Sequence, residues 1–340
     1  MSTSARLSYG LLVLTLVLAA ALHLGGPFLI ALFSYFALRQ LLVVTKRKWL
    51  ALVLFILVVA ALALAAVYFT RAAVRALPEM AETSIPSASA WAEARNIDLP
   101  FTDVQSLRDY IIDSVKEEAR YLQNVAHVAG STTALLLFSL IAIVAAASLF
   151  LKSGLDIDRE AHPVKNNLYS VFSDEVTARF RDFYRSFATV MGAQIMISLT
   201  NTVLTSIFVL TVHLPHRTLV IVLTFLCGLV PIIGNLISNT IIVCLALTVS
   251  IGLALGALIF LVVIHKLEYL LNSKIIGQRI RNPVWLTLIG LVIGERLMGI
   301  PGLVLAPVVL NYIRVEMLKV EVPQRAKTPN SRFQAPRNIQ

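Results

Sequence analysis

Long apolar blocks alternate with short polar segments along this 340-residue chain. A helix that crosses a bilayer needs about 20 mostly apolar residues, because each residue adds only about 1.5 Å of length. Blocks of this kind occupy residues 9–24, 28–44, 50–69, 132–151, 187–212, 219–271 and 284–313. The pattern therefore predicts an all-α polytopic membrane protein with six to eight transmembrane segments.

The composition agrees with a chain that has lipid as its solvent. Hydrophobic residues make up 58% of the sequence and charged residues 14%, whereas soluble domains average roughly 45–50% and 25%. A soluble fold of this composition would expose large apolar patches to water. The net charge of +10 does not indicate nucleic-acid binding, because the basic residues cluster at the ends of the apolar blocks. We expect the lipid bilayer as the main partner, and no cofactor or metal.

The basic residues also predict an orientation. Lys46, Arg47 and Lys48 form the densest positive patch, and the positive-inside rule places such a loop in the cytoplasm. We expect the protein to lie in the inner membrane of a bacterial cell, with both termini in the cytoplasm. The chain divides into 1–70 (N-terminal membrane segments), 71–130 (an extramembrane amphipathic helical segment), 131–318 (a membrane core with the transport site) and 319–340 (a disordered cytoplasmic tail).

The extramembrane segment has two interpretations. Its amphipathic helices could form a lid or a contact in a homo-oligomer, or they could be a solvated hairpin that only joins two spans.

Polar side chains line one face of the predicted span 187–212. Gln194, Ser198, Asn201 and Thr205 recur every three or four residues, so they share one helical face. Such side chains either form hydrogen bonds with a neighbouring helix or line a wet path. Both interpretations stay open at this point.

Glycine and proline interrupt two of the apolar blocks near their midpoints. Proline lacks an N–H group and glycine permits chain reversal, and paired interruptions are a typical sign of a transporter's binding site. Two asparagines one turn apart, Asn235 and Asn239, follow the first break and could cap it or contact a solute. The break residues are Gly228, Pro231 and Gly234 in the first block, and Gly299, Pro301, Gly302 and Pro307 in the second. A simple proline kink is the alternative for each break.

Two topologies fit this half of the chain. Eight full spans leave the basic residues around Arg279 outside, against the charge rule. The other solution makes 219–250 and 284–313 re-entrant hairpins and gives six full spans, and we favour it because each break lies near the middle of its block.

Two acids lie within or beside the apolar blocks. Glu268 ends one block, and Glu295 comes just before the second break. An ionisable residue at membrane depth is a functional hypothesis by default, although each acid could instead pair with a lysine or arginine at an interface.

A series of charged residues, glycines and prolines marks the second half of the chain: Lys266, Glu268, Lys274, Gly277, Pro283, Gly290, Gly294, Gly299, Gly302 and Pro307, with Gly228, Pro231 and Gly234 upstream. Through these residues the chain resembles the autoinducer-2 exporter family of bacterial permeases. The resemblance implies a multi-span transporter, with export of a small hydrophilic signal or sodium–proton antiport as known activities. By position, it makes Glu268 the strongest candidate for a coupling or structural acid, and the two breaks candidate gates.

We therefore predict a carrier for a small polar solute. The chain lacks the phosphate-binding loop G-x-x-x-x-G-K-[ST], which leaves an H⁺ or Na⁺ gradient or passive efflux as the energy source. It also lacks the H-E-x-x-H and G-x-S-x-G motifs of hydrolytic enzymes, so we do not expect an enzyme. A membrane scaffold that transports nothing is the alternative.

Overall fold

All regular structure in the described residues is α-helical. The computed structural model describes residues 3–94, 96, 103, 105–106, 119–152, 168–231, 233–275 and 283–319. The helices are α1 (Thr3–Ala21), α2 (Gly25–Thr45), α3 (Lys48–Glu93), α5 (Ala119–Lys152), α6 (Leu168–Thr211), α7 (Arg217–Gly228), α8 (Ile233–Val249), α9 (Ile251–Ile275), α10 (Val284–Met298) and α11 (Ile300–Leu318). The predicted all-α architecture is confirmed.

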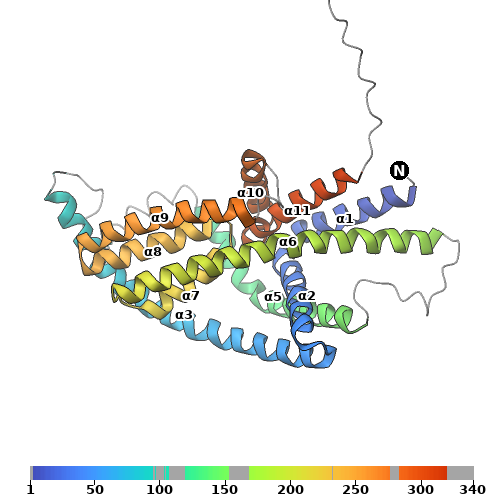
Figure 1. Cartoon of the computed structure of the whole chain (residues 1–340), viewed down its shortest axis with the longest axis horizontal. Helices are drawn as coiled ribbons and strands as arrows, with labels where there is room; N and C mark the ends of the chain where they lie inside the picture. The colour runs from blue at the N-terminus through green and yellow to red at the C-terminus, as the bar shows by residue number, and fades with distance from the viewer. Residues whose placement is uncertain are drawn as a thin grey trace, which may run out of the picture.

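The long helix α6 organises the molecule. Its 44 residues extend along most of the molecule's length, with α1 and α11 beside its N-terminal half and α7, α8 and α9 gathered at its C-terminal half (Figure 1). Two hydrophobic cores follow from this arrangement. Phe183 and Phe187 are buried against α1 and α11, while Val209 is buried against α7, α8 and α9.

A third core joins the N-terminal helices to α5. Tyr35 and Leu38 of α2 pack with Phe55 of α3 and Phe150 of α5. The ring of Tyr35 also meets the ring of Tyr184 edge-on, at 4.8 Å between centroids, and thereby connects this core to α6.

Large apolar side chains cover the outside of the helices. Leu64 of α3, Leu136 of α5 and Ile259 of α9 are examples in which most of the side chain is exposed. Within the described ranges, four helices are long and apolar enough to cross a membrane: α2, the first part of α3, α6 and α11. The described parts of five further apolar helices are shorter, at 10–17 residues, so the count of six to eight spans stays a prediction.

The two segments predicted outside the membrane are described only in part. Helix α3 continues past its apolar part to Glu93, and α5 begins at Ala119. Most residues between these helices, and the tail after Lys319, lie outside the described residues. The predicted amphipathic segment and the predicted disordered tail are therefore not tested.

Candidate functional site

The polar face of α6 packs against the first predicted break. Gln194 Nε2 donates a hydrogen bond to the carbonyl oxygen of Gly228 at 2.7 Å, and Ser198 Oγ donates to the carbonyl oxygen of Phe225 at 2.7 Å. Both carbonyls lie in the last turn of α7, where a helix leaves its carbonyls without partners from the helix itself. Gln194 and Ser198 therefore hold the broken end of α7 onto α6.

One turn further along α6, Asn201 has a different environment. Its side chain is only 7% exposed, and its Nδ2 lies 3.4 Å from Oδ1 of Asn235. Asn201 Oδ1 has no hydrogen-bond partner in the part of the chain that the structure describes. Leaving a buried acceptor unpaired costs about 1–3 kcal/mol. A donor or a cation outside the described residues would therefore satisfy this oxygen.

Close approaches of the backbone explain the glycines at the first break. Helix α7 ends at Gly228 and α8 begins at Ile233, with Pro231 in the turn between them. A Cβ atom on Gly234 would lie 1.6 Å from the carbonyl oxygen of Cys227, and one on Gly228 would lie 2.5 Å from Ser198 Oγ. Only glycine fits at both positions without a shift of the backbone or of its neighbour.

The second break lies between α10 and α11. Gly299 has φ +63°, a conformation that side-chain-bearing residues rarely adopt, and Pro301 stands in the first turn of α11, where proline is tolerated. The two helices touch backbone to backbone, since a Cβ on Gly302 would lie 1.8 Å from the carbonyl oxygen of Gly294. Pro307 lies inside α11, which continues through it. The interruption is therefore at Gly299 and not at Pro307.

The second break also contacts the turn between α1 and α2. A Cβ on Gly25 would lie 3.2 Å from the Cβ of Met298 and 3.3 Å from the Cβ of Pro301. Two Gly/Pro-rich turns, more than 270 positions apart in the sequence, therefore lie against each other.

The remaining predicted residues are Asn239, Glu295 and Glu268. Asn239 lies one turn beyond Asn235 in α8 and is partly buried. Glu295 is partly buried in the last turn of α10. Glu268 belongs to α9, but its side chain lies outside the described part of the chain. Among the described residues, no three His, Cys, Asp or Glu side chains gather as a metal site would require.

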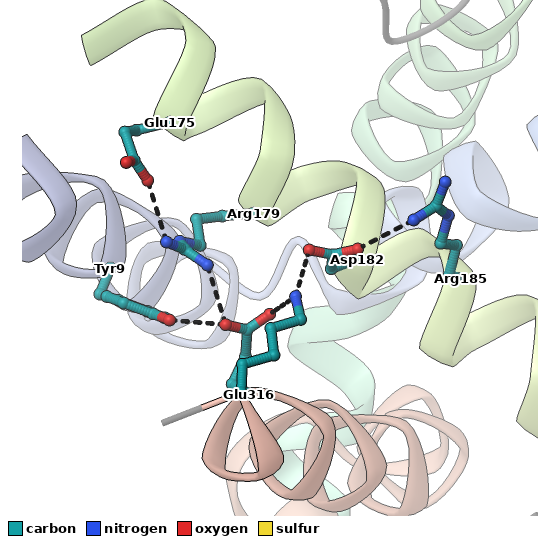
Figure 2. A network of polar contacts seen from close by, with 7 residues as sticks. Tyr9, Glu175, Arg179, Asp182, Arg185 and Glu316 are labelled. Atoms are coloured by element: carbon teal, nitrogen blue, oxygen red, sulfur yellow. Dashed lines mark hydrogen bonds and ion pairs between the residues drawn. The ribbon is translucent and has the colours of Figure 1, made fainter. Parts of the chain in front are cut away.

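A cluster of charges that sequence reasoning missed joins α1, α6 and α11 (Figure 2). Glu316 of α11 accepts hydrogen bonds from Tyr9 Oη at 2.5 Å and from Arg179 Nη1 at 2.8 Å, and its other oxygen pairs with Lys319 Nζ at 2.8 Å. We call this the Glu316 cluster; its members are Tyr9, Glu175, Arg179, Asp182, Arg185, Glu316 and Lys319.

The cluster is shielded from solvent at its centre. The side chains of Glu316, Arg179 and Asp182 are 8%, 15% and 16% exposed, and the guanidinium of Arg179 lies 4.3 Å from the ring centroid of Tyr9. Partial burial opposes the charge of Lys319, but hydrogen bonds with Asp182 and Glu316 outweigh it and raise the pKa of Lys319. Buried ion pairs of this kind require nearly complete hydrogen bonding. Three helices supply most of it, while Arg179 Nε has no hydrogen-bond partner among the described residues.

A sequence signal for the cluster existed in part. Glu175, Arg179 and Asp182 are four and three residues apart, which places them on one face of a helix. Glu316 follows the apolar block that ends at residue 313, so the sequence does not mark it as an acid within an apolar block.

Comparison with known proteins relates this chain to a family of transporters. A family model described as "AI-2E family transporter" matches residues 9–319. YdbI of Bacillus subtilis (strain 168), a protein that is provisionally named as a transport protein, is 28% identical over 167 residues, which are 48% of this chain and 48% of that relative. The matched region thus spans about half the length of the curated relative.

Proposed function

This chain belongs to the AI-2E transporter family, and from that membership we propose that it is a permease that carries a small polar solute across the bacterial inner membrane. Its apolar helices and their exposed apolar surface suit a multi-pass membrane protein. We propose a class of solute, an energy source and a site for this permease.

The unpaired oxygen of Asn201 is the observation that carries the proposed site. It lies on α6 beside Asn235, close to the α7–α8 break. Irregular backbone at membrane depth is tolerated only where protein buries it or where it lines a cavity. Gln194 and Ser198 hold the α7 side of the break in place. A solute with an N–H or O–H group, or a Na⁺ ion, would complete the hydrogen bonding or coordination of Asn201.

We place the energy coupling at Glu268. Helix α9, which carries this acid, packs against α6 and α8, the two helices that carry the asparagines. A carboxylate in a low dielectric has a raised pKa, so it can exchange a proton, or be neutralised by a bound cation, during the transport cycle.

The Glu316 cluster supports the proposed orientation. It brings together Tyr9 near the N-terminus, the basic stretch around Arg179 and Lys319 at the end of α11. The charge rule assigns each of these segments to the cytoplasm, so a single location for all three agrees with cytoplasmic termini.

Flux into proteoliposomes tests the function. We would follow H⁺ and Na⁺ with fluorescent dyes and a panel of radiolabelled small polar solutes, for the native protein, Asn201→Leu and Glu268→Gln. We expect Asn201→Leu to abolish flux with little change in the melting temperature, because leucine removes an unpaired buried acceptor and only a long hydrogen bond, 3.4 Å, to Asn235. Glu268→Gln should keep passive solute exchange and lose its response to the ion gradient.

Two results would contradict the proposal. Unchanged flux in Asn201→Leu would remove the α6–α8 site from the mechanism. Absence of any flux in the native protein, across the panel and under both gradients, would favour a scaffold instead.

A further inference from the structure

An apolar groove separates α1 from the α10–α11 pair. It has a volume of about 520 Å³ and is lined by apolar side chains together with Gly290, Gly294 and Gly302. This volume is within the roughly 300–1,000 Å³ that is usual for small-ligand sites. The lining residues Val17 of α1 and Ile293 of α10 are also more than half exposed. The groove is therefore continuous with the apolar surface that faces lipid.

The groove is charged at one end only. Arg296 lines it beside Met298 and Gly302, close to the second break. From Gly302 the lining continues along α11 to Leu310, a distance of about 12 Å at 1.5 Å per residue. One leaflet contributes about half of the roughly 30 Å hydrocarbon core. The groove thus has the length of one leaflet and a cation at one end.

Arg296 is exposed and forms no ion pair within the described residues. The preceding acid, Glu295, is partly buried, and successive helical residues point about 100° apart. The guanidinium is consequently free to meet an anion. Arginine binds phosphate through two parallel hydrogen bonds, and a phospholipid is the molecule that offers a phosphate and an apolar chain together.

We propose that this groove binds an anionic phospholipid, with one acyl chain along α11 and the phosphate at Arg296. Gly290, Gly294 and Gly302 form part of the groove lining where α10 and α11 pack closely together. The bound chain fills the gap between α1 and the α10–α11 pair. A single cation at one end of an apolar groove matches a phospholipid, which joins a phosphate to an apolar chain, better than it matches a second copy of this protein.

Two matched substitutions on one helix test the proposal. Val17 lines the groove and is 54% exposed, whereas Val13, one turn earlier on α1, is 57% exposed and does not line it. We would exchange purified native protein, Val17→Trp and Val13→Trp into micelles that contain phosphatidylglycerol. Native mass spectrometry then counts the lipids that each chain retains. Ile293→Trp fills the groove from the α10 wall and covers the case in which Val17→Trp fails to fold.

We expect one retained phosphatidylglycerol in the native protein and in Val13→Trp, and its loss in Val17→Trp and Ile293→Trp. Arg296→Gln should lower retention of phosphatidylglycerol roughly fivefold and retention of phosphatidylcholine less, because the choline cation offsets the charge of its phosphate. Equal retention in Val17→Trp and Val13→Trp would overturn the proposal. A groove-filling variant that dissociates a native oligomer would also overturn it, since a second copy would then be the occupant.

Discussion

Removal of the Glu316 carboxylate should loosen the packing of α1 and α11 on α6. Glu316→Leu deletes the acceptor of Tyr9 and Arg179 and one partner of Lys319. Breaking a buried ion pair usually costs about 3–5 kcal/mol, because the remaining charge is left without compensation. Glu175 stays with Arg179, and Asp182 stays with Lys319, so we expect the lower end, about 3 kcal/mol.

A melting measurement in detergent can detect this loss. At about 2 °C per kcal/mol for a chain of this size, Glu316→Leu should lower the melting temperature by about 6 °C. Glu295→Leu is the matched control, because it removes a partly buried acid for which the described residues show no ion pair. Size-exclusion profiles of heated samples, followed by tryptophan fluorescence, provide the readout.

The double variant distinguishes an ion pair from simple loss of packing. Arg179→Met combined with Glu316→Leu replaces both buried charges by apolar groups, which is often neutral or stabilising. We expect it to melt above Glu316→Leu alone, with a coupling energy of about 1–3 kcal/mol. If the double variant melts no higher than the single one, or if Glu316→Leu melts with the native protein, the cluster does not hold these helices together.

Three further predictions concern the breaks. Gly234→Ala should prevent the native α7–α8 turn, because its Cβ would lie 1.6 Å from the Cys227 carbonyl oxygen; a large loss of folded monodisperse protein checks this. Gln194→Leu leaves the terminal α7 carbonyl without its donor and should cost about 1–3 kcal/mol, measured as a lower melting temperature. In a variant that lacks the native cysteines, we would introduce Gly26→Cys or Ile300→Cys and add an impermeant thiol reagent from outside. Both cysteines should be labelled, or both should stay unlabelled. Labelling of only one of them would contradict a shared depth for the two turns.

The helices could be predicted from the sequence because the bilayer restricts which segments can cross it. Every lipid-facing segment must be apolar and must satisfy its own backbone hydrogen bonds, so composition alone locates the blocks. The breaks were also predictable, since Pro231 and Gly299 have backbone preferences that a straight helix cannot meet. The sequence could not identify which partner each break would find. Only the fold brings Gln194 to the Gly228 carbonyl.

The Glu316 cluster shows why long-range pairs escape a reading of one sequence. Tyr9 and Glu316 are 307 positions apart, and Arg179 and Glu316 are 137 apart. No local spacing rule connects residues at such separations. Each of these residues, considered alone, looks like a charged residue at the end of a membrane span. Only its burial in the folded protein distinguishes it.

The contact of Gly25 with Met298 and Pro301 limits the possible topologies. Helices α1 and α11 have 19 residues each, or about 28 Å, which nearly matches the roughly 30 Å hydrocarbon core. Both extend from the Glu316 cluster to this contact, so their turns lie at one depth. A re-entrant α10–α11 pair would therefore require an equally re-entrant α1–α2 pair. Of these helices, α11 is among those long and apolar enough to cross a membrane, which favours a full crossing for α11.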